Sequence, residues 1–337
     1  MIELDLKSVY VEITNKCNLH CKHCYNDSKF QNNIFLGTSA IEKLYQTLSE
    51  NKINPIAISG GEPLLHPNIL TILKFSTLFE TQTQLITNGV LLNKYCDYIN
   101  NAPNIMLQLS IDGYGKTHDL LRGNGVFEIV NANLNELNNN VNLSMKCTIN
   151  SFNISQIETI IQYAIDKGAH TIAFSTLCNQ GRSVEFQEIH VSANQLKKTI
   201  DNISELSEKY KDYIEVKNMK INYSHCPFCS SGQIDVSPRI DPLGNVYLCS
   251  MFTNPMFKIG NIYDDDLISI LKSERCINMV SFMRSFRNIL DCSNCLLNGL
   301  CQKGCLAQYL NNMVQYQDDM CDIKKNDFCR FLNNHIV

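Results

Sequence analysis

Short runs rich in β-branched residues alternate with amphipathic helical stretches over the first 180 residues, and this order restricts the fold more than any other feature. Such an alternation predicts repeated strand–helix units around a parallel sheet. Six units are fewer than the eight of a complete barrel, so we expect an α/β fold with a partial (β/α)6 TIM-like barrel. The expected strands are Ser8–Ile13, Pro55–Ser59, Thr83–Ile86, Ile105–Leu109, Asn142–Ile149 and Thr171–Phe174, and the expected helices include Thr38–Ser49, Asn68–Phe79, Phe127–Leu137 and Ser155–Lys167.

The unusual residues of this region follow the expected strands. Active sites of barrel enzymes lie on the loops at the C-terminal ends of the strands. Asn150 ends the fifth expected strand, and Ser175 ends the sixth. Because all these positions follow strand ends, we expect the unusual residues to lie together on one rim of the barrel. The residues that follow the first four strands, in chain order, are Cys17, Cys21 and Cys24, then Gly60-Gly61-Glu62-Pro63, then Thr87-Asn88-Gly89, and then Ser110-Ile111-Asp112-Gly113.

Three cysteines, Cys17, Cys21 and Cys24, share one short loop, and no fourth follows at a matching distance. A 4Fe–4S cluster normally takes four cysteine ligands, so three would leave one iron open to a small molecule. The chain has 16 cysteines in 337 residues, and at that density the spacing alone is weak evidence. Its position on the expected rim is what indicates a catalytic iron–sulfur site.

This loop resembles the CxxxCxxC signature of the radical S-adenosylmethionine (radical SAM) enzymes. The resemblance implies that the amino and carboxylate groups of S-adenosylmethionine (SAM) chelate the open iron. One electron then splits SAM into methionine and a 5′-deoxyadenosyl radical, which abstracts hydrogen from the substrate.

The same resemblance assigns SAM contacts along the rim. Gly60, Gly61, Glu62 and Pro63 match the GGEP run that binds the SAM amino group. His23 takes the aromatic position against adenine, and Ser110 and Asp112 resemble the group that contacts ribose or methionine. Arg122 resembles the arginine that pairs with the methionine carboxylate, and its planar fork suits a carboxylate. Thr87 and Asn88 either contact SAM or only shape a turn.

A second cysteine-rich region follows a polar helical stretch from Ser192 to Lys211. Two CxxC pairs could bind zinc. The detailed spacing instead resembles the SPASM domain of certain radical SAM enzymes, with a β-hairpin turn at Gly244 and helices. We therefore expect a barrel domain over 1–220 and a SPASM domain over 221–337. The resemblance implies two closed auxiliary 4Fe–4S clusters, which with the cluster of the first loop make three in all. The first auxiliary cluster would be held by Cys226, Cys229, Cys249 and Cys305, and the second by Cys292, Cys295, Cys301 and Cys321.

Five cysteines remain outside these ligand sets. Cys96 and Cys147 fall within an expected helix and strand, where cysteine commonly acts as a small hydrophobe. Cys178 follows the sixth strand on the active rim, where it could donate a hydrogen atom to a product radical. Cys329 could be a spare ligand, and the sequence leaves the role of Cys276 open.

Most SPASM-bearing relatives act on peptides, so the resemblance implies an oxidoreductase that matures a ribosomally made peptide by cross-linking, epimerisation or oxidation. The alternatives are small-molecule cofactor or haem-type biosynthesis, anaerobic sulfatase maturation, and an iron–sulfur scaffold without catalysis. In formylglycine-forming relatives an aspartate base follows the cysteine of a GxxxxC motif. In this chain the motif runs from Gly244 to Cys249, and the next residue is Ser250, which cannot act as a carboxylate base near neutral pH.

Composition limits the partners. The net charge is −4 with no long basic patch, so we expect no nucleic acid. No apolar run approaches the ~18 residues of a membrane span, and Met1–Lys7 lacks signal-peptide features, so we expect a cytoplasmic protein with reduced thiols. The first expected strand begins at Ser8, so a leader-binding module is absent or encoded separately. A flavodoxin- or ferredoxin-type protein should supply the electron.

Overall fold

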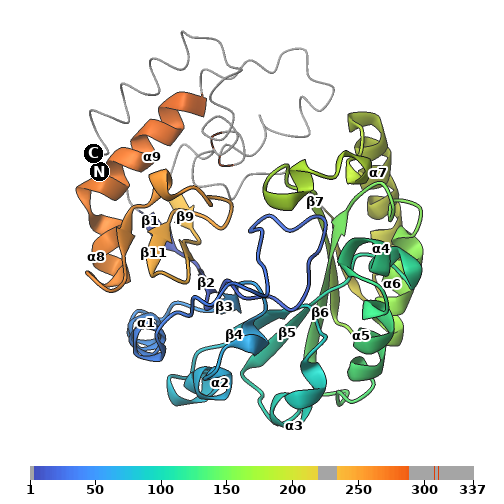
Figure 1. Cartoon of the computed structure of the whole chain (residues 1–337), viewed down its shortest axis with the longest axis horizontal. Helices are drawn as coiled ribbons and strands as arrows, with labels where there is room; N and C mark the ends of the chain where they lie inside the picture. Colours follow the sequence, from blue (N-terminus) through green and yellow to red (C-terminus); the bar gives the residue numbers. More distant parts are fainter. Residues whose placement is uncertain (1–3, 219–233, 288–306, 308–309, 311–337) are drawn as a thin grey trace.

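The computed structural model describes residues 4–218 and 234–287, together with residues 307 and 310. A ten-stranded sheet forms its centre (Figure 1). Its parallel part contains the six expected strands, and β8 and β12 are the two edges of the described sheet, so the partial barrel is confirmed. In order these six strands are β2 (Val9–Glu12), β3 (Ile56–Ser59), β4 (Thr83–Thr87), β5 (Ile105–Ser110), β6 (Asn142–Ile149) and β7 (Thr171–Thr176).

Helices cover the outer face of the sheet (Figure 1). Each expected helix is present, and α1 shows why: Ile41, Leu44, Tyr45 and Leu48 recur at helical spacing and are all buried. Gly168 ends the last of the expected helices with φ +71°, and its N–H donates to the Ile165 carbonyl at 2.9 Å. The barrel helices are α1 (Thr38–Glu50), α2 (Ile69–Leu78), α3 (Cys96–Ile99), α4 (Lys116–Arg122), α5 (Val126–Leu134) and α6 (Ile157–Asp166).

The barrel sheet continues beyond the six expected strands. The polar stretch that follows them forms α7 (Ala193–Tyr210), which begins with a capping box between Ser192 and Gln195. The chain then adds β8 (Glu215–Lys217) parallel to β7. This strand was not predicted from the sequence, because only Val216 of its three residues is buried.

The C-terminal segment extends the opposite edge of the same sheet. β10 (Arg239–Ile240) pairs in parallel with β2, and β11 (Asn245–Tyr247) forms the expected hairpin with β10 around Gly244. The further described elements are β1 (Leu4–Leu6), β9 (Ile234–Val236), β12 (Gly260–Asn261), α8 (Leu267–Lys272) and α9 (Glu274–Arg287).

Most of the expected auxiliary-cluster ligands lie outside the described residues, and only Cys249 lies within them. Cys276, in α9, is fully buried. Within the described part of the chain, no helix combines the length and apolar character needed to cross a bilayer. The cysteines outside the described residues are Cys226, Cys229, Cys292, Cys295, Cys301, Cys305, Cys321 and Cys329.

Candidate functional site

A cavity of about 380 Å³ lies at the C-terminal ends of the parallel strands. Its wall includes residues from the ends of β3, β4, β5, β6 and β7, and from the loop that follows β2. The structure thus brings most of the expected site residues to one place. Those that line the cavity are Cys17, Cys21, His23, Cys24, Gly60, Gly61, Thr87, Asn88, Ser110, Arg122 and Cys178.

Three expected SAM contacts, Glu62, Pro63 and Asp112, do not line the cavity. Both carboxylates are fully buried, and Pro63 is also buried in the turn that starts a short helix. The two carboxylates instead accept hydrogen bonds from residues that line the cavity, Glu62 from Thr87 and Asn88, and Asp112 from Arg122 and Thr148.

The glycine pair brings two backbone segments together. Gly61 N–H donates to the Thr14 carbonyl and Glu62 N–H to the Lys16 carbonyl, both at 2.8 Å. A Cβ on Gly61 would overlap the Lys16 carbonyl oxygen, so only glycine permits this approach. The pair therefore fixes the chain just before Cys17, in addition to leaving the cavity wall open.

Glu62 joins two rim loops. Its carboxylate accepts hydrogen bonds from Thr87 Oγ1 at 2.7 Å, from Asn88 N at 2.9 Å and from Leu64 N at 3.2 Å. Burial raises the pKa of Glu62 to about 7, although these hydrogen bonds oppose the rise. The loops after β3 and β4 are held together by one enclosed carboxyl group.

Asp112 holds three other parts of the rim. Its Oδ2 accepts from Arg122 Nε at 2.5 Å and lies 3.1 Å from His23 Nε2, while Oδ1 accepts from Thr148 N at 2.7 Å. Burial alone would raise the pKa of Asp112, but Arg122 and His23 hold it well below its usual value. The backbone N–H of Asp112 donates to Nδ1 of the buried His118. Asp112 thereby orients Arg122 and His23, the two side chains expected to contact SAM.

The three cysteine thiols fit an iron–sulfur cluster by their chemistry. Burial raises the pKa of Cys17 to about 12 and that of Cys21 to about 11, so both are protonated in the metal-free chain near neutral pH. Metal ligation requires thiolates, and cluster assembly would release these protons. Within the described residues, no three His, Cys, Asp or Glu side chains are arranged to hold a single metal ion.

A residue that was not predicted from the sequence holds the cysteine loop in place. Arg182, in the loop after β7, donates from Nε to the Cys21 carbonyl at 2.9 Å and from Nη1 to the Ser28 carbonyl at 2.8 Å. The preceding Gly181 has φ +62°, and a Cβ there would overlap the Cys24 carbonyl oxygen. The Gly-Arg pair in an active-rim loop is the signal that could have indicated this contact.

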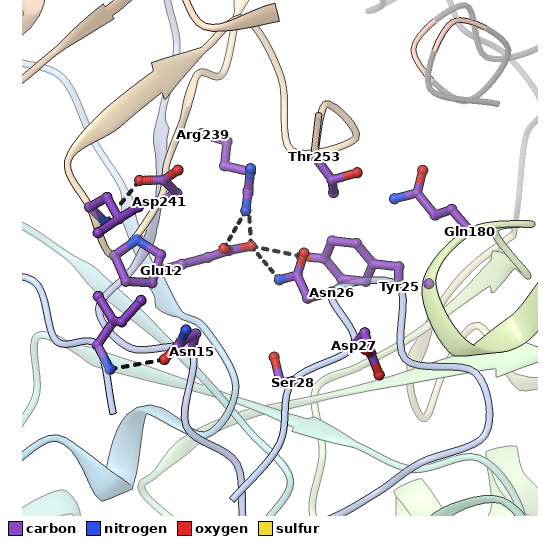
Figure 2. A pocket seen from close by; sticks show the side chains of 14 residues that line it. Glu12, Asn15, Tyr25, Asn26, Asp27, Ser28, Gln180, Arg239, Asp241 and Thr253 are labelled. Carbon is purple, nitrogen blue, oxygen red and sulfur yellow. Dashed lines mark hydrogen bonds and ion pairs between the residues drawn. The ribbon is translucent and has the colours of Figure 1, made fainter. Parts of the chain in front are cut away.

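A second cavity, of about 360 Å³, shares Tyr25 with the first (Figure 2). Figure 2 shows Glu12 at its centre: Arg239 donates to both carboxylate oxygens, at 2.9 and 2.6 Å, and Asn26 and Tyr25 donate to Oε1. The Tyr25 hydroxyl also lies 3.1 Å from that of Tyr10. The polar network connects the cysteine loop, β2 and β10, and the sequence analysis did not identify it.

Two family models match the chain. The radical SAM superfamily model covers residues 11–164, and the model of the SPASM iron–sulfur cluster-binding domain covers 229–296.

Similar proteins include the antilisterial bacteriocin subtilosin biosynthesis protein AlbA of Bacillus subtilis (strain 168), 26% identical over 94% of this chain and 70% of AlbA. The mycofactocin maturase MftC of Mycolicibacterium smegmatis is 22% identical over 88% of this chain and 77% of its own length.

Solved structures share the fold. Streptococcus suis SuiB bound to SAM superposes with a TM-score of 0.72 at 15% identity, over 92% of this chain and 74% of SuiB. Native anSMEcpe with bound AdoMet and Cp18Cys peptide gives a TM-score of 0.69 at 16% identity, over 98% of this chain and 99% of that chain.

Proposed function

Because the chain belongs to the radical SAM superfamily and carries a SPASM iron–sulfur domain, we propose that it matures a ribosomally made peptide by radical chemistry. A cluster held by the cysteine loop would pass one electron from the reductant to the sulfonium C–S bond of SAM, and SAM would supply the 5′-deoxyadenosyl group that takes hydrogen from the peptide. The change made in the peptide is a cross-link, an epimerisation or an oxidation.

One observation carries the proposal: the cysteine loop, the glycine pair and Arg122 meet at a single cavity. Cys17, Cys21 and Cys24 would hold the cluster there. Arg122, oriented by Asp112, would bind the methionine carboxylate of SAM. Cys178, on the same wall, is the proposed hydrogen-atom donor.

The peptide substrate is supported by relatives named for bacteriocin biosynthesis and for mycofactocin maturation, each of which matches most of the chain. The sulfatase-maturation alternative is weakened by the cavity wall. Ser250 and Met251 line it, and no described lining residue is Asp or Glu. A carboxylate base of the formylglycine type therefore has no counterpart among the described residues of this wall.

The cofactor proposal includes two auxiliary clusters, which make three clusters in the chain. Cys226, Cys229, Cys249 and Cys305 would hold one, and Cys292, Cys295, Cys301 and Cys321 the other. The division into 1–220 and 221–337 belongs to the same proposal. So do a flavodoxin- or ferredoxin-type electron donor, a separate leader-binding protein and a cytoplasmic location.

The test removes the three loop cysteines together. Replacing Cys17, Cys21 and Cys24 by alanine should lower the iron of anaerobically reconstituted protein from about twelve atoms per chain to about eight. Formation of 5′-deoxyadenosine from SAM and dithionite should stop. Cys96→Ala is the matched control, because this thiol is buried in α3 away from the cavity, and it should change neither quantity. Unchanged iron in the triple variant would show that the loop holds no cluster.

A further inference from the structure

Lys146 points into the cavity from the middle of β6. Along this strand Met145 and Cys147 are fully buried in the core, whereas Lys146 lies on the opposite face and is open to the cavity. In register it sits between Ser110 of β5 and Ala173 of β7. The strand geometry therefore places an ammonium group inside the barrel.

The cavity is rich in cations. Arg122, Arg182 and Lys146 line it, and no carboxylate does so among the described residues. Arg122 is paired with Asp112, and Arg182 is paired with Asp27 at 2.8 Å. Lys146, by contrast, makes no ion pair or hydrogen bond with any side chain that the structure describes. Among the described cations of the wall, Lys146 is therefore the one without a directly bonded carboxylate.

The Lys146 side chain is exposed to the cavity, so a ligand that enters the cavity can contact its ammonium group directly. The protein around the cavity lowers the pKa of Lys146, although the charges of Cys178 and Asp112 oppose this effect. A bound anion would stabilise the charged form of Lys146. The neighbouring wall offers Gln108, Thr148 and Ser175, which are neutral hydrogen-bonding groups suited to a carboxylate.

Arg122 and Lys146 share Asp112 as a charged neighbour but differ in the cysteines that act on them. Arg122 interacts with Asp112, Cys21 and Cys17, on the side of the cysteine loop. Lys146 interacts with Cys178 and Asp112, on the side of the loop after β7. The carboxylate of SAM is expected beside the cysteine loop, and SAM carries a net positive charge. The substrate is therefore the favoured source of an anion for Lys146.

We propose that Lys146 binds a carboxylate of the substrate peptide, so that the modified residue lies next to an aspartate, a glutamate or the C-terminal carboxylate. The assignment rests on the proposed function for the identity of the substrate as a peptide. The binding preference itself can be measured independently of turnover.

The experiment uses full-length, anaerobically reconstituted protein saturated with SAM and two small probes. N-acetyl-glutamate N-methylamide carries the carboxylate, and N-acetyl-glutamine N-methylamide is its neutral isostere. Calorimetry or ligand-observed NMR should show about tenfold tighter binding of the glutamate probe, as expected for a hydrogen bond to a charged group. Lys146→Met should abolish this preference, and Lys146→Arg should retain it.

Lys94→Met is the matched control, since Lys94 is exposed and does not line the cavity; it should keep the preference. Lys146→Gln gives the same readout if the methionine variant does not fold. Equal binding of the two probes to the wild type, or a preference that survives both neutral variants, would refute the proposal. A tenfold loss of SAM affinity in Lys146→Met would assign the lysine to SAM instead. Failure of the wild type to form 5′-deoxyadenosine would count against the proposed function and leave the probe result standing.

Discussion

Asp112 is the residue whose replacement tests the architecture of the site most directly. Its carboxylate accepts from Arg122 Nε at 2.5 Å and from Thr148 N at 2.7 Å, and lies 3.1 Å from His23 Nε2. Asp112→Asn keeps one oxygen for Thr148. The new amide group then faces two hydrogen-bond donors, and Arg122 is left in the protein interior without its counter-charge.

The expected loss follows from that unpaired charge. Removing one partner of a buried ion pair costs about 3–5 kcal/mol, and the side chain of Asp112 is fully buried. Because the folded-state pKa of Asp112 lies below its unfolded value, the stabilisation is complete above the unfolded pKa, near 4, and is lost as the pH falls. A measurement at pH 7 therefore reports the whole effect. We expect the free energy of unfolding to fall by at least about 3 kcal/mol.

The assay is denaturant unfolding of the reduced, metal-free chain, followed by far-UV circular dichroism because the chain has no tryptophan. Asp97→Asn, at an exposed position on α3, is the control and should stay within about 0.5 kcal/mol of the wild type. The double variant Asp112→Asn/Arg122→Met no longer contains the unpaired guanidinium group of Arg122. Its loss of unfolding free energy should therefore be smaller than the sum of the losses of the two single variants. Full additivity, or a loss below about 1 kcal/mol for Asp112→Asn, would refute the reasoning.

Two further variants test the rim. Gly61→Ala should cost about 1–3 kcal/mol through overlap with the Lys16 carbonyl. This is more than the cost of Gly37→Ala, where the backbone is extended with φ −60° and a Cβ would meet only the end of the Tyr263 side chain, at 3.2 Å; equal urea midpoints would contradict this. Burial raises the pKa of Glu62 to about 7, so its ionisation should contribute a slope that lowers the stability of the metal-free chain by about 2–3 kcal/mol between pH 5 and pH 8. That contribution is measured as the difference between the wild-type and Glu62→Gln profiles. Glu62→Gln should remove that slope, and parallel pH profiles for the two proteins would show that Glu62 does not titrate there.

The sequence predicted the barrel strands well because each has several consecutive β-forming residues with a buried face. The range Asn142–Ile149 coincides with β6, and Cys147 is fully buried there, as expected of a small hydrophobe. β8 was missed because three residues carry no measurable periodicity. The pairing of β10 with β2 could not be predicted, since these strands are far apart in the chain and their register depends on the assembled fold.

The sequence predicted which residues belong to the site, but not the direction in which their side chains point. Motif positions identified the cavity-lining cysteines and Arg122, yet they also suggested that Glu62 and Asp112 face a ligand. Side-chain direction at the end of a strand depends on the loop that follows, and both carboxylates turn into the wall. Arg182 contacts the cysteine loop across 161 residues of sequence, a distance over which no local pattern gives information.

The three cationic side chains of the cavity wall, Arg122, Arg182 and Lys146, differ in the groups that they affect electrostatically. Arg122 and Arg182 both lower the pKa of Cys21 against the stronger effect of burial, so they favour the thiolates that metal ligation requires. Conversion of the thiols to thiolates would place negative charge beside these two arginines. No cysteine of that loop appears among the groups that act on the charge of Lys146. Thiolates in the cysteine loop would therefore act mainly on the two arginines, and a ligand that brings a carboxylate to the β6–β7 side would give Lys146 a direct ion-pair partner.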